Sequence, residues 1–172
     1  MVTAIIIPDI TVTTQPTNVN ECVGGLDQMT VAISGGSGLV SYQWQSSTDG
    51  NAPWANAVGT GSTTNTFTPP SVTPGTTYYR VLVNATGSDC QQAVSSVVTA
   101  IIIPDITVTT QPTNVNECVG GLDQMTVAIS GGSGLISYQW QSSTTGAEPW
   151  ANEIGTGSTT NTFTPLSATP GT

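Results

Sequence analysis

The sequence predicts an all-β protein made of tandem β-sandwich domains, and three observations support this fold class. Short runs rich in Val, Ile, Thr, Tyr and Trp alternate with polar residues and are separated by Gly, Pro, Asn and Ser clusters, which is typical of a sandwich. No stretch shows a convincing helical period. Residues 4–39 recur unchanged as residues 100–135, an offset of 96 positions. A period of this length fits one complete β-sandwich domain.

The repeat divides the chain into one full copy and one incomplete copy. Residues 2–76 align with residues 98–172, and only 8 of these 75 positions differ. The residues that follow position 76 in the first copy have no counterpart in the second copy, so we expect its last two strands to be absent. We predict domains at 1–102 and 103–172, the second completed by a neighbouring molecule or continuing into a longer fibre. An open sheet edge of this kind invites strand addition from another chain.

Alternation and turn residues set the order of strands expected in the first copy. The first strand contains Pro16, which fits a sheet edge or a kink better than a central strand. In the second strand Met29, Val31 and Ile33 alternate with smaller or polar residues, so these three side chains should face the core. The expected strands are residues 10–17, 17–22, 28–34, 40–46, 64–68, 77–84 and 92–102.

The later strands should complete the core and lead into the second copy. Phe67 is expected to point inward, as are Tyr79, Val81 and Val83, which share one face of their strand. The last strand runs without a loop into an apolar junction at residues 103–105. A short apolar junction predicts a semi-rigid linear array of domains instead of a flexible linker.

The order of these signals resembles an immunoglobulin-like domain. Trp44 in the YQW segment takes the place of the core Trp of the third strand, and Trp140 is its counterpart in the second copy. Tyr79, in the PGTTYY segment, takes the place of the tyrosine corner. The positions of the antibody disulfide correspond to Val31 or Ile33 and to Val81, so the resemblance implies that this bridge is absent.

The combination of ECVGG, SYQW, TNTFTPP, PGTTYYRVLV and SDC looks more specifically like the Ig-like repeats of large Bacteroidota cell-surface and gliding-associated adhesin-type proteins. That resemblance implies a structural repeat of an extracellular stalk, adhesin or filament on a bacterial cell surface. The implied partners are other copies of the repeat, joined head-to-tail or by strand complementation, and surface glycans.

The charged residues exclude several other classes of function. The chain has one Arg, no Lys, no His and a net charge of −9, which argues against binding nucleic acid or anionic membrane surfaces. No run is long enough to insert into a bilayer. Without His or Lys no Ser-His or Ser-Lys nucleophile can be built, and three Cys without His make a zinc site improbable. We therefore expect no enzymatic activity and no cofactor.

The cysteines admit three arrangements. Cys22 and Cys90 recur once per domain, and an intradomain disulfide between them would stabilise the fold by about 3–4 kcal/mol. Immunoglobulin topology, however, places these positions at opposite ends of a domain. A bridge from the Cys22 position of one domain to the Cys90 position of the next is then an alternative, and free thiols are the third. Cys118 has no partner within its own domain.

Two further groups of residues are candidate contacts. Trp54 and Trp150, each preceded by Pro, could cover one end of the sandwich or stack on a sugar. The second reading leads to an alternative function, a carbohydrate-binding module. Carboxylates near the domain junctions could hold calcium, although they lack the spacing of a calcium loop, and solvated surface carboxylates are the competing interpretation. These candidates are Asp9, Glu21, Asp27, Asp105, Glu117 and Asp123.

Overall fold

The structure is a computed structural model that describes residues 3, 6–86 and 91–167 of the chain. The described residues form strands, turns and irregular segments, and they divide into two compact units, Met1–Pro104 and Asp105–Thr172. Among them there is no helix of the length and apolarity needed to cross a membrane. The all-β fold class predicted from the alternation of apolar and polar residues is therefore confirmed.

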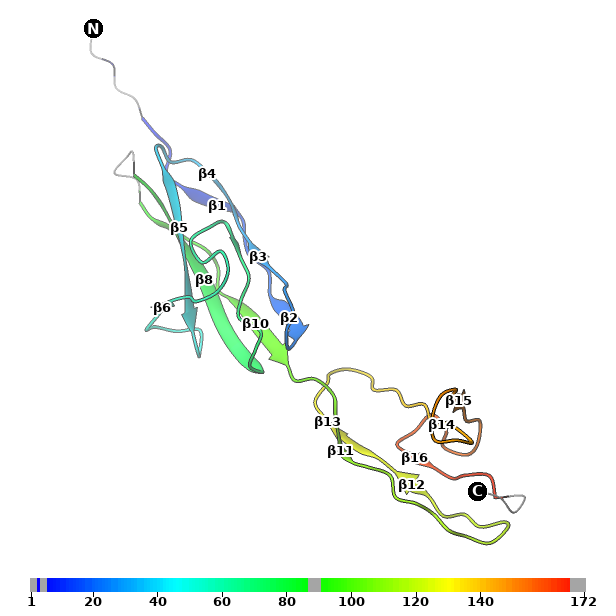
Figure 1. Ribbon diagram of the computed structural model, residues 1–172. Helices are drawn as coiled ribbons and strands as arrows, with labels where there is room; N and C mark the ends of the chain where they lie inside the picture. The colour runs from blue at the N-terminus through cyan, green and yellow to red at the C-terminus, as the bar shows by residue number, and fades with distance from the viewer. Residues whose placement is uncertain (1–2, 4–5, 87–90, 168–172) are drawn as a thin grey trace. The chain divides into compact units, whose positions relative to one another are not determined.

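The larger layer of the first unit is one mixed sheet (Figure 1). Its path follows β2 (Val19–Cys22), β10 (Val98–Ile103), β8 (Gly75–Ala85), β5 (Val40–Ser47) and β6 (Ala55–Asn56), with β9 (Ala93–Val94) also paired to β8. β8 pairs with β5 and β10 in antiparallel fashion, whereas β2 runs parallel to β10. β10, β8 and β5 are thus the inner strands of this sheet, each paired with a neighbour on both sides.

The second layer consists of two short antiparallel pairs. β1 (Thr11–Thr14) pairs with β4 (Ala32–Ser34), and β3 (Met29–Thr30) pairs with β7 (Thr66–Phe67). The single strand expected at 28–34 is divided at Val31, whose amide donates to the carbonyl of Asn65 at 2.9 Å.

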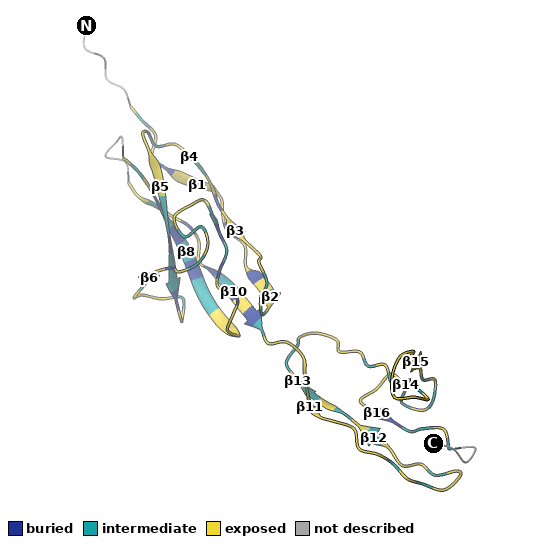
Figure 2. Cartoon of the chain, in the orientation of Figure 1, coloured by how far each residue is buried: buried dark blue, intermediate teal, exposed yellow. Residues whose placement is uncertain are grey.

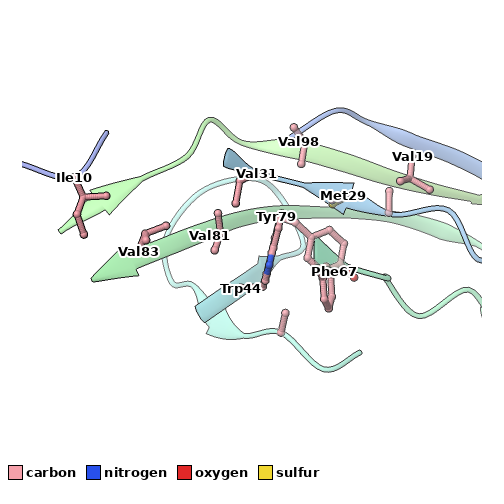
Figure 3. Packing of buried hydrophobic residues seen from close by; sticks show 12 residues of the cluster. Ile10, Val19, Met29, Val31, Trp44, Phe67, Tyr79, Val81, Val83 and Val98 are labelled. Carbon is pink, nitrogen blue, oxygen red and sulfur yellow. The ribbon is translucent and has the colours of Figure 1, made fainter. Parts of the chain in front are cut away.

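The side chains that meet between the layers follow the predicted alternation. Met29 and Val31 are 0% and 1% exposed, and Ile33 packs against the same cluster, so their predicted inward direction is confirmed. Phe67 is also fully buried, as predicted. Figure 3 shows Met29, Val31 and Phe67 beside Trp44, Tyr79, Val81 and Val83. The indole Nε1 of Trp44 donates to the Thr64 carbonyl at 2.9 Å, which satisfies its one polar atom inside the core.

The strand expected at 92–102 is interrupted because a side chain replaces a backbone partner. Ser95, which is buried, donates its amide to the Val81 carbonyl at 3.0 Å, and its hydroxyl accepts from the Val81 amide at 2.9 Å. The hydroxyl takes the place of a ladder carbonyl, so the ladder is broken between β9 and β10. The first strand likewise ends at Thr14, before Pro16, which has no amide hydrogen to donate.

The second unit repeats the local pairs of the first. β11 (Thr107–Thr110) pairs with β13 (Ala128–Ser130), β12 (Met125–Thr126) with β16 (Thr162–Phe163), and β14 (Gln141–Ser142) with β15 (Ala151–Asn152). Residues 115–118 form no strand, although the identical sequence forms β2 in the first unit. The eight-residue β5 is reduced to two residues in β14. Both changes affect segments whose partners in the first unit are β10 and β8.

Candidate functional site

A groove in the second unit is the most distinct candidate site. It encloses about 530 Å³, and we call it the Trp140 groove. Its lining consists of Val127, Tyr138, Gln139, Trp140, Gln141, Glu148 and Trp150. Tyr138 and Trp140 alternate with Gln139 and Gln141 along one segment, of which only Gln141 and Ser142 are strand.

The same residues in the first unit are covered by β8. Trp44, the counterpart of Trp140, is 0% exposed and lies opposite Val81 in the β5–β8 register. In the second unit Trp140 and Val127 are only half-buried. Figure 2 shows the contrast, with buried stretches along β8 and β10 and mostly intermediate or exposed residues after Asp105. Trp140 nevertheless keeps its local contacts, because its Nε1 donates to the Thr160 carbonyl at 2.9 Å and its ring stacks on Phe163.

Trp54 lies on the outer face of the large sheet in the first unit. The guanidinium carbon of Arg80 lies 4.4 Å from the centroid of the Trp54 ring, and Arg80 Nε donates to Gln45 Oε1 at 3.0 Å. Arg80 alternates with the buried Tyr79 and Val81, so it points away from the core. Trp54 therefore packs on Arg80 at the outer face of the sheet.

The counterpart of this cluster in the second unit carries a new carboxylate. Trp150 is 43% exposed, and Glu148 replaces the Ala found at position 52. Glu148 Oε2 accepts from the Trp150 amide at 3.1 Å, which holds the carboxylate beside the indole. Gln141, the counterpart of Gln45, lines the same groove. The arrangement is one that an arginine side chain fits, because it offers an aromatic face, an amide oxygen and a carboxylate together.

Cys22 and Cys118 are exposed, and neither forms a disulfide with a described residue. Cys90 lies outside the described residues, so the intradomain bridge between Cys22 and Cys90 stays a prediction. Cys22 is the last residue of β2, opposite Ile103 and hence near Gly75, the first residue of β8.

The carboxylates considered for calcium are not gathered into one cluster. The described residues contain no group of three His, Cys, Asp or Glu side chains that could hold a metal ion. Glu21 instead accepts a hydrogen bond at 2.8 Å from the Asp27 amide, and Glu117 accepts the equivalent bond from Asp123 at 2.7 Å. These two pairs close the turn that precedes β3 or β12. Asp9 and Asp105 take no part in these two hydrogen bonds.

Two titratable groups in the first unit have shifted pKa values. Burial raises the pKa of the Tyr79 hydroxyl, partly offset by a hydrogen bond with the Thr77 side chain. Hydrogen bonds from the Asn51 amide and the Ser47 hydroxyl lower the pKa of Asp49. Both shifts are explained by local packing and turn geometry, and neither group lies beside a second titratable side chain that would make it a catalytic pair.

The chain was compared with protein-family models, with curated protein sequences and with solved structures. A family model described as "Domain of unknown function (DUF8696)" matches residues 11–104, from β1 to the residue after β10. No curated protein sequence matches the chain. Among solved structures, the I-band fragment I67–I69 from titin has a TM-score of 0.59 at 12% identity, over 95% of this chain and 57% of that one.

Two other solved structures are also similar. The E-to-A variant of titin domains I67–I69 has a TM-score of 0.58 at 12% identity, with the same coverage of 95% and 57%. Sidekick-1 immunoglobulin domains 1–5 has a TM-score of 0.49 at 14% identity, over 73% of this chain and 26% of that one. The chain thus spans between about a quarter and somewhat over half of these structures. The titin likeness confirms the predicted immunoglobulin-like sandwich, and at this identity it shows the fold alone.

Proposed function

Given that the chain belongs to the DUF8696 family, whose model matches more than half of it, we propose that it is a structural repeat of an extracellular bacterial stalk, adhesin or filament. The described residues offer no catalytic grouping, and the sequence has no His or Lys to activate a nucleophile. We further propose a non-enzymatic role. The assignment to Bacteroidota surface proteins rests on the sequence resemblance given above.

The pairing of β10, the last strand of the first unit, and the short connection after it support this proposal. β10 pairs with β8 on one edge and β2 on the other, and the Val23 amide adds a bond to the Ile103 carbonyl at 3.1 Å. Only Pro104 lies between β10 and the second unit, and Pro104 restricts its own backbone torsion. We propose that this short connection, which leaves a doubly paired strand and passes through one proline, serves a semi-rigid array.

The composition supports a place outside the cell. The net charge of −9 gives solubility by self-repulsion, and the surface is otherwise rich in uncharged polar residues. We propose that repetition of the domain serves length and stiffness.

The length of arrays tests the stalk role. Arrays of two, four and six complete 96-residue repeats would be compared by small-angle X-ray scattering. We expect the maximum dimension to grow in proportion to the repeat number. Inserting Gly-Ser-Gly-Ser between Ile103 and Pro104 at each junction is the matched control and should weaken this growth towards the square root expected of flexible links. Square-root growth of the unmodified arrays would contradict the proposal.

The proposed extracellular location of the protein is tested separately, on cells of the source organism. An antibody raised against residues 1–104 should stain intact cells. Staining that requires permeabilised cells would contradict an extracellular role. It would not bear on the proposal that the array is stiff.

The exposure of Trp150 favours one alternative function, a carbohydrate-binding module. Its indole could stack on a sugar ring, whereas Trp54 has one contact with Arg80 already. A glycan array would show specific binding that Trp150→Ala abolishes and Trp54→Ala reduces. Absence of glycan binding by the unmodified chain would remove this alternative.

A further inference from the structure

We propose that the outer face of the large sheet in the first unit binds a sugar that carries a single carboxylate. The Arg80 guanidinium is the contact for the carboxylate, and the Trp54 indole is the surface on which the sugar ring lies. Together with Gln45 and Asn56 these residues are called the Arg80 site. This inference rests on the carbohydrate-binding alternative given above and deepens it, because it names a class of sugar and a site in the first unit.

The argument starts from the contacts of the only cation in the chain. The sequence has ten carboxylates and one Arg, yet both contacts that the structure gives Arg80 are with uncharged side chains. Its guanidinium carbon lies 4.4 Å from the centroid of the Trp54 ring, and its Nε donates to Gln45 Oε1 at 3.0 Å. Its two terminal nitrogens have no hydrogen-bond partner among the residues that the structure describes. A guanidinium that is held in place with these donors unused matches the paired oxygens of a carboxylate.

A ligand can reach this arginine from solvent. Arg80 is half-buried and alternates along β8 with the buried Tyr79 and Val81, so it lies on the outer face of the sheet. Trp54 is also half-buried, so part of its indole still meets solvent. An indole offers an apolar surface to the ring of a sugar, while the guanidinium beside it takes an acidic substituent of the same ring.

Two amide side chains share this face with the arginine. Gln45 lies opposite Arg80 in the β5–β8 register and opposite Asn56 in the β5–β6 register. Directly opposed residues of an antiparallel pair lie on the same face of the sheet. Because an amide both donates and accepts hydrogen bonds, it suits the hydroxyls of a sugar. The Arg80 site thus combines an aromatic surface, two amides and one cation, which fits an acidic sugar better than an apolar protein partner.

The differences between the two copies of the repeat lie around the same Trp. Of the 8 positions that differ among the 75 aligned, five fall within residues 49–58, at positions 49, 51, 52, 57 and 58. Trp54 and Asn56 themselves recur, as Trp150 and Asn152. Loops that flank a fixed binding residue are where ligand specificity changes between related domains. The variation therefore supports a binding role for this segment, with a ligand that differs from one copy to the other.

One of these differences changes the charge beside the Trp. Ala52 is replaced by Glu148 in the second copy, where Glu148 Oε2 accepts from the Trp150 amide at 3.1 Å. A carboxylate at this position therefore lies beside the Trp whose counterpart carries the guanidinium in the first unit. With Ala52, the anion that meets Arg80 has to come from a ligand. The net charge of −9 repels ligands with many carboxylates, which limits the class to sugars with an isolated one.

Titration of the isotope-labelled 172-residue chain with simple glycosides tests the proposal. The probes are methyl glucuronide and methyl galacturonide, the methyl esters of these two acids, and the neutral methyl glucoside and methyl galactoside. We expect at least one acid to bind saturably, with NMR shifts at the Trp54 indole N–H and the Arg80 Nε–H. Its ester and its neutral counterpart should bind at least tenfold more weakly, because they lack the charged hydrogen bonds. No saturable binding of either acid, or equal affinity for acid and ester, would overturn the proposal.

The natural difference at position 52 supplies the sharpest variant. Ala52→Glu introduces the residue of the second copy and should weaken binding of the acid more than tenfold, because an internal carboxylate then meets Arg80. Val58→Ile, also a second-copy residue in this segment, changes an exposed side chain and should leave affinity unchanged. Binding of the acid that survives Ala52→Glu would refute the Arg80 site.

Two substitutions of the arginine separate its charge from its geometry. Arg80→Gln should abolish the preference for the acid over its ester. Arg80→Lys keeps the charge but not the paired donors, so it should retain part of the preference. A preference for the acid that is unchanged in Arg80→Gln would show that the carboxylate is bound elsewhere.

Other ligand classes are outcomes of the same titration. Tighter binding of methyl glucoside 6-phosphate than of either acid would replace the carboxylate by a phosphate, and tighter binding of the peptide Gly-Asp-Gly would replace the sugar by a protein partner. Binding of neutral glycosides with shifts only at Trp150 would overturn this inference and leave the carbohydrate-binding alternative standing. Scattering from arrays of complete repeats is independent of these results, so the stalk proposal can stand or fall separately.

Discussion

The rings of Trp44 and Phe67 stack with centroids 5.3 Å apart and planes inclined by 22°. The repeat reproduces this pair as Trp140 and Phe163, at 5.4 Å and 23°. The first unit adds a third ring, Tyr79, whose centroid lies 5.2 Å from that of Phe67. The aromatic pair of the second unit meets no third ring among the residues that the structure describes.

This difference predicts unequal costs for the same substitution. Phe67→Ala should lower the free energy of unfolding of the first unit by about 3–5 kcal/mol, because it removes a ring packed on two others. Phe163→Ala should cost the second unit less, since no counterpart of Tyr79 packs there. Urea titration with hydrogen exchange read at β7 and β16 would separate the two units. Equal losses would contradict the difference in packing.

Arg80 and Trp54 should be energetically coupled. An Arg over an indole at a partly exposed site contributes about 0.5–1 kcal/mol. We expect Arg80→Ala and Trp54→Ala together to destabilise the first unit by less than the sum of the single changes. Chemical unfolding of all four members of the cycle measures the coupling, and a coupling energy of zero would show that the contact contributes nothing.

Position 25 requires glycine because the Glu21 side chain occupies the space that a Cβ would take, and not because of the backbone torsion. A Cβ at this position would lie 2.1 Å from Glu21 Oε2, which accepts the Asp27 amide. Gly25→Ala should therefore destabilise the first unit by about 1–2 kcal/mol by displacing this carboxylate. The double variant with Glu21→Ala should lose little more than Glu21→Ala alone. If the two losses simply add, as judged by thermal unfolding, the contact is not the cause.

The raised pKa of Tyr79 predicts a loss of stability in alkali. Because the folded state holds the proton more tightly, stability should fall as the pH rises above about 10, the pKa of an unfolded tyrosine. Tyr79→Phe should reduce this alkaline loss. Urea unfolding at pH 8 and pH 11 measures the effect, and Tyr78→Phe is the control on the adjacent residue. An alkaline loss of the same size in Tyr79→Phe would contradict the assignment.

The intradomain bridge between Cys22 and Cys90 predicts that oxidation stabilises the first unit. Cys22→Ser should then lower the unfolding free energy by about 3–4 kcal/mol under oxidising conditions, with Cys118→Ser as the matched control. An unchanged unfolding free energy would contradict the bridge. Mass mapping of the unreduced chain is the direct check, and a Cys22–Cys90 crosslink would establish it. A bridge between neighbouring repeats stays a prediction for longer arrays.

Several features of the site were within reach of sequence reasoning and others were not. The repeat indicated that strands lack partners in the second copy, and the alternation identified the inward residues of β3, β4 and β8. The contact between Arg80 and Trp54 joins residues 26 positions apart through the pairing of β5 with β8, and no local pattern signals it. Comparison of the two copies shows Glu148 as a carboxylate gained at a repeated position, but not its hydrogen bond with the Trp150 amide.

The sequence by itself determined which hairpin-like pairs form, because both members of each pair lie within the repeated segment. β1–β4 and β11–β13 even share the same shift in register. Only the tertiary structure decided whether VNEC becomes a strand. It is β2 at Val19–Cys22, paired with β10, and irregular at residues 115–118, where the described chain supplies no such partner. A strand is defined by backbone hydrogen bonds to a neighbour, and that neighbour is not encoded in the segment itself.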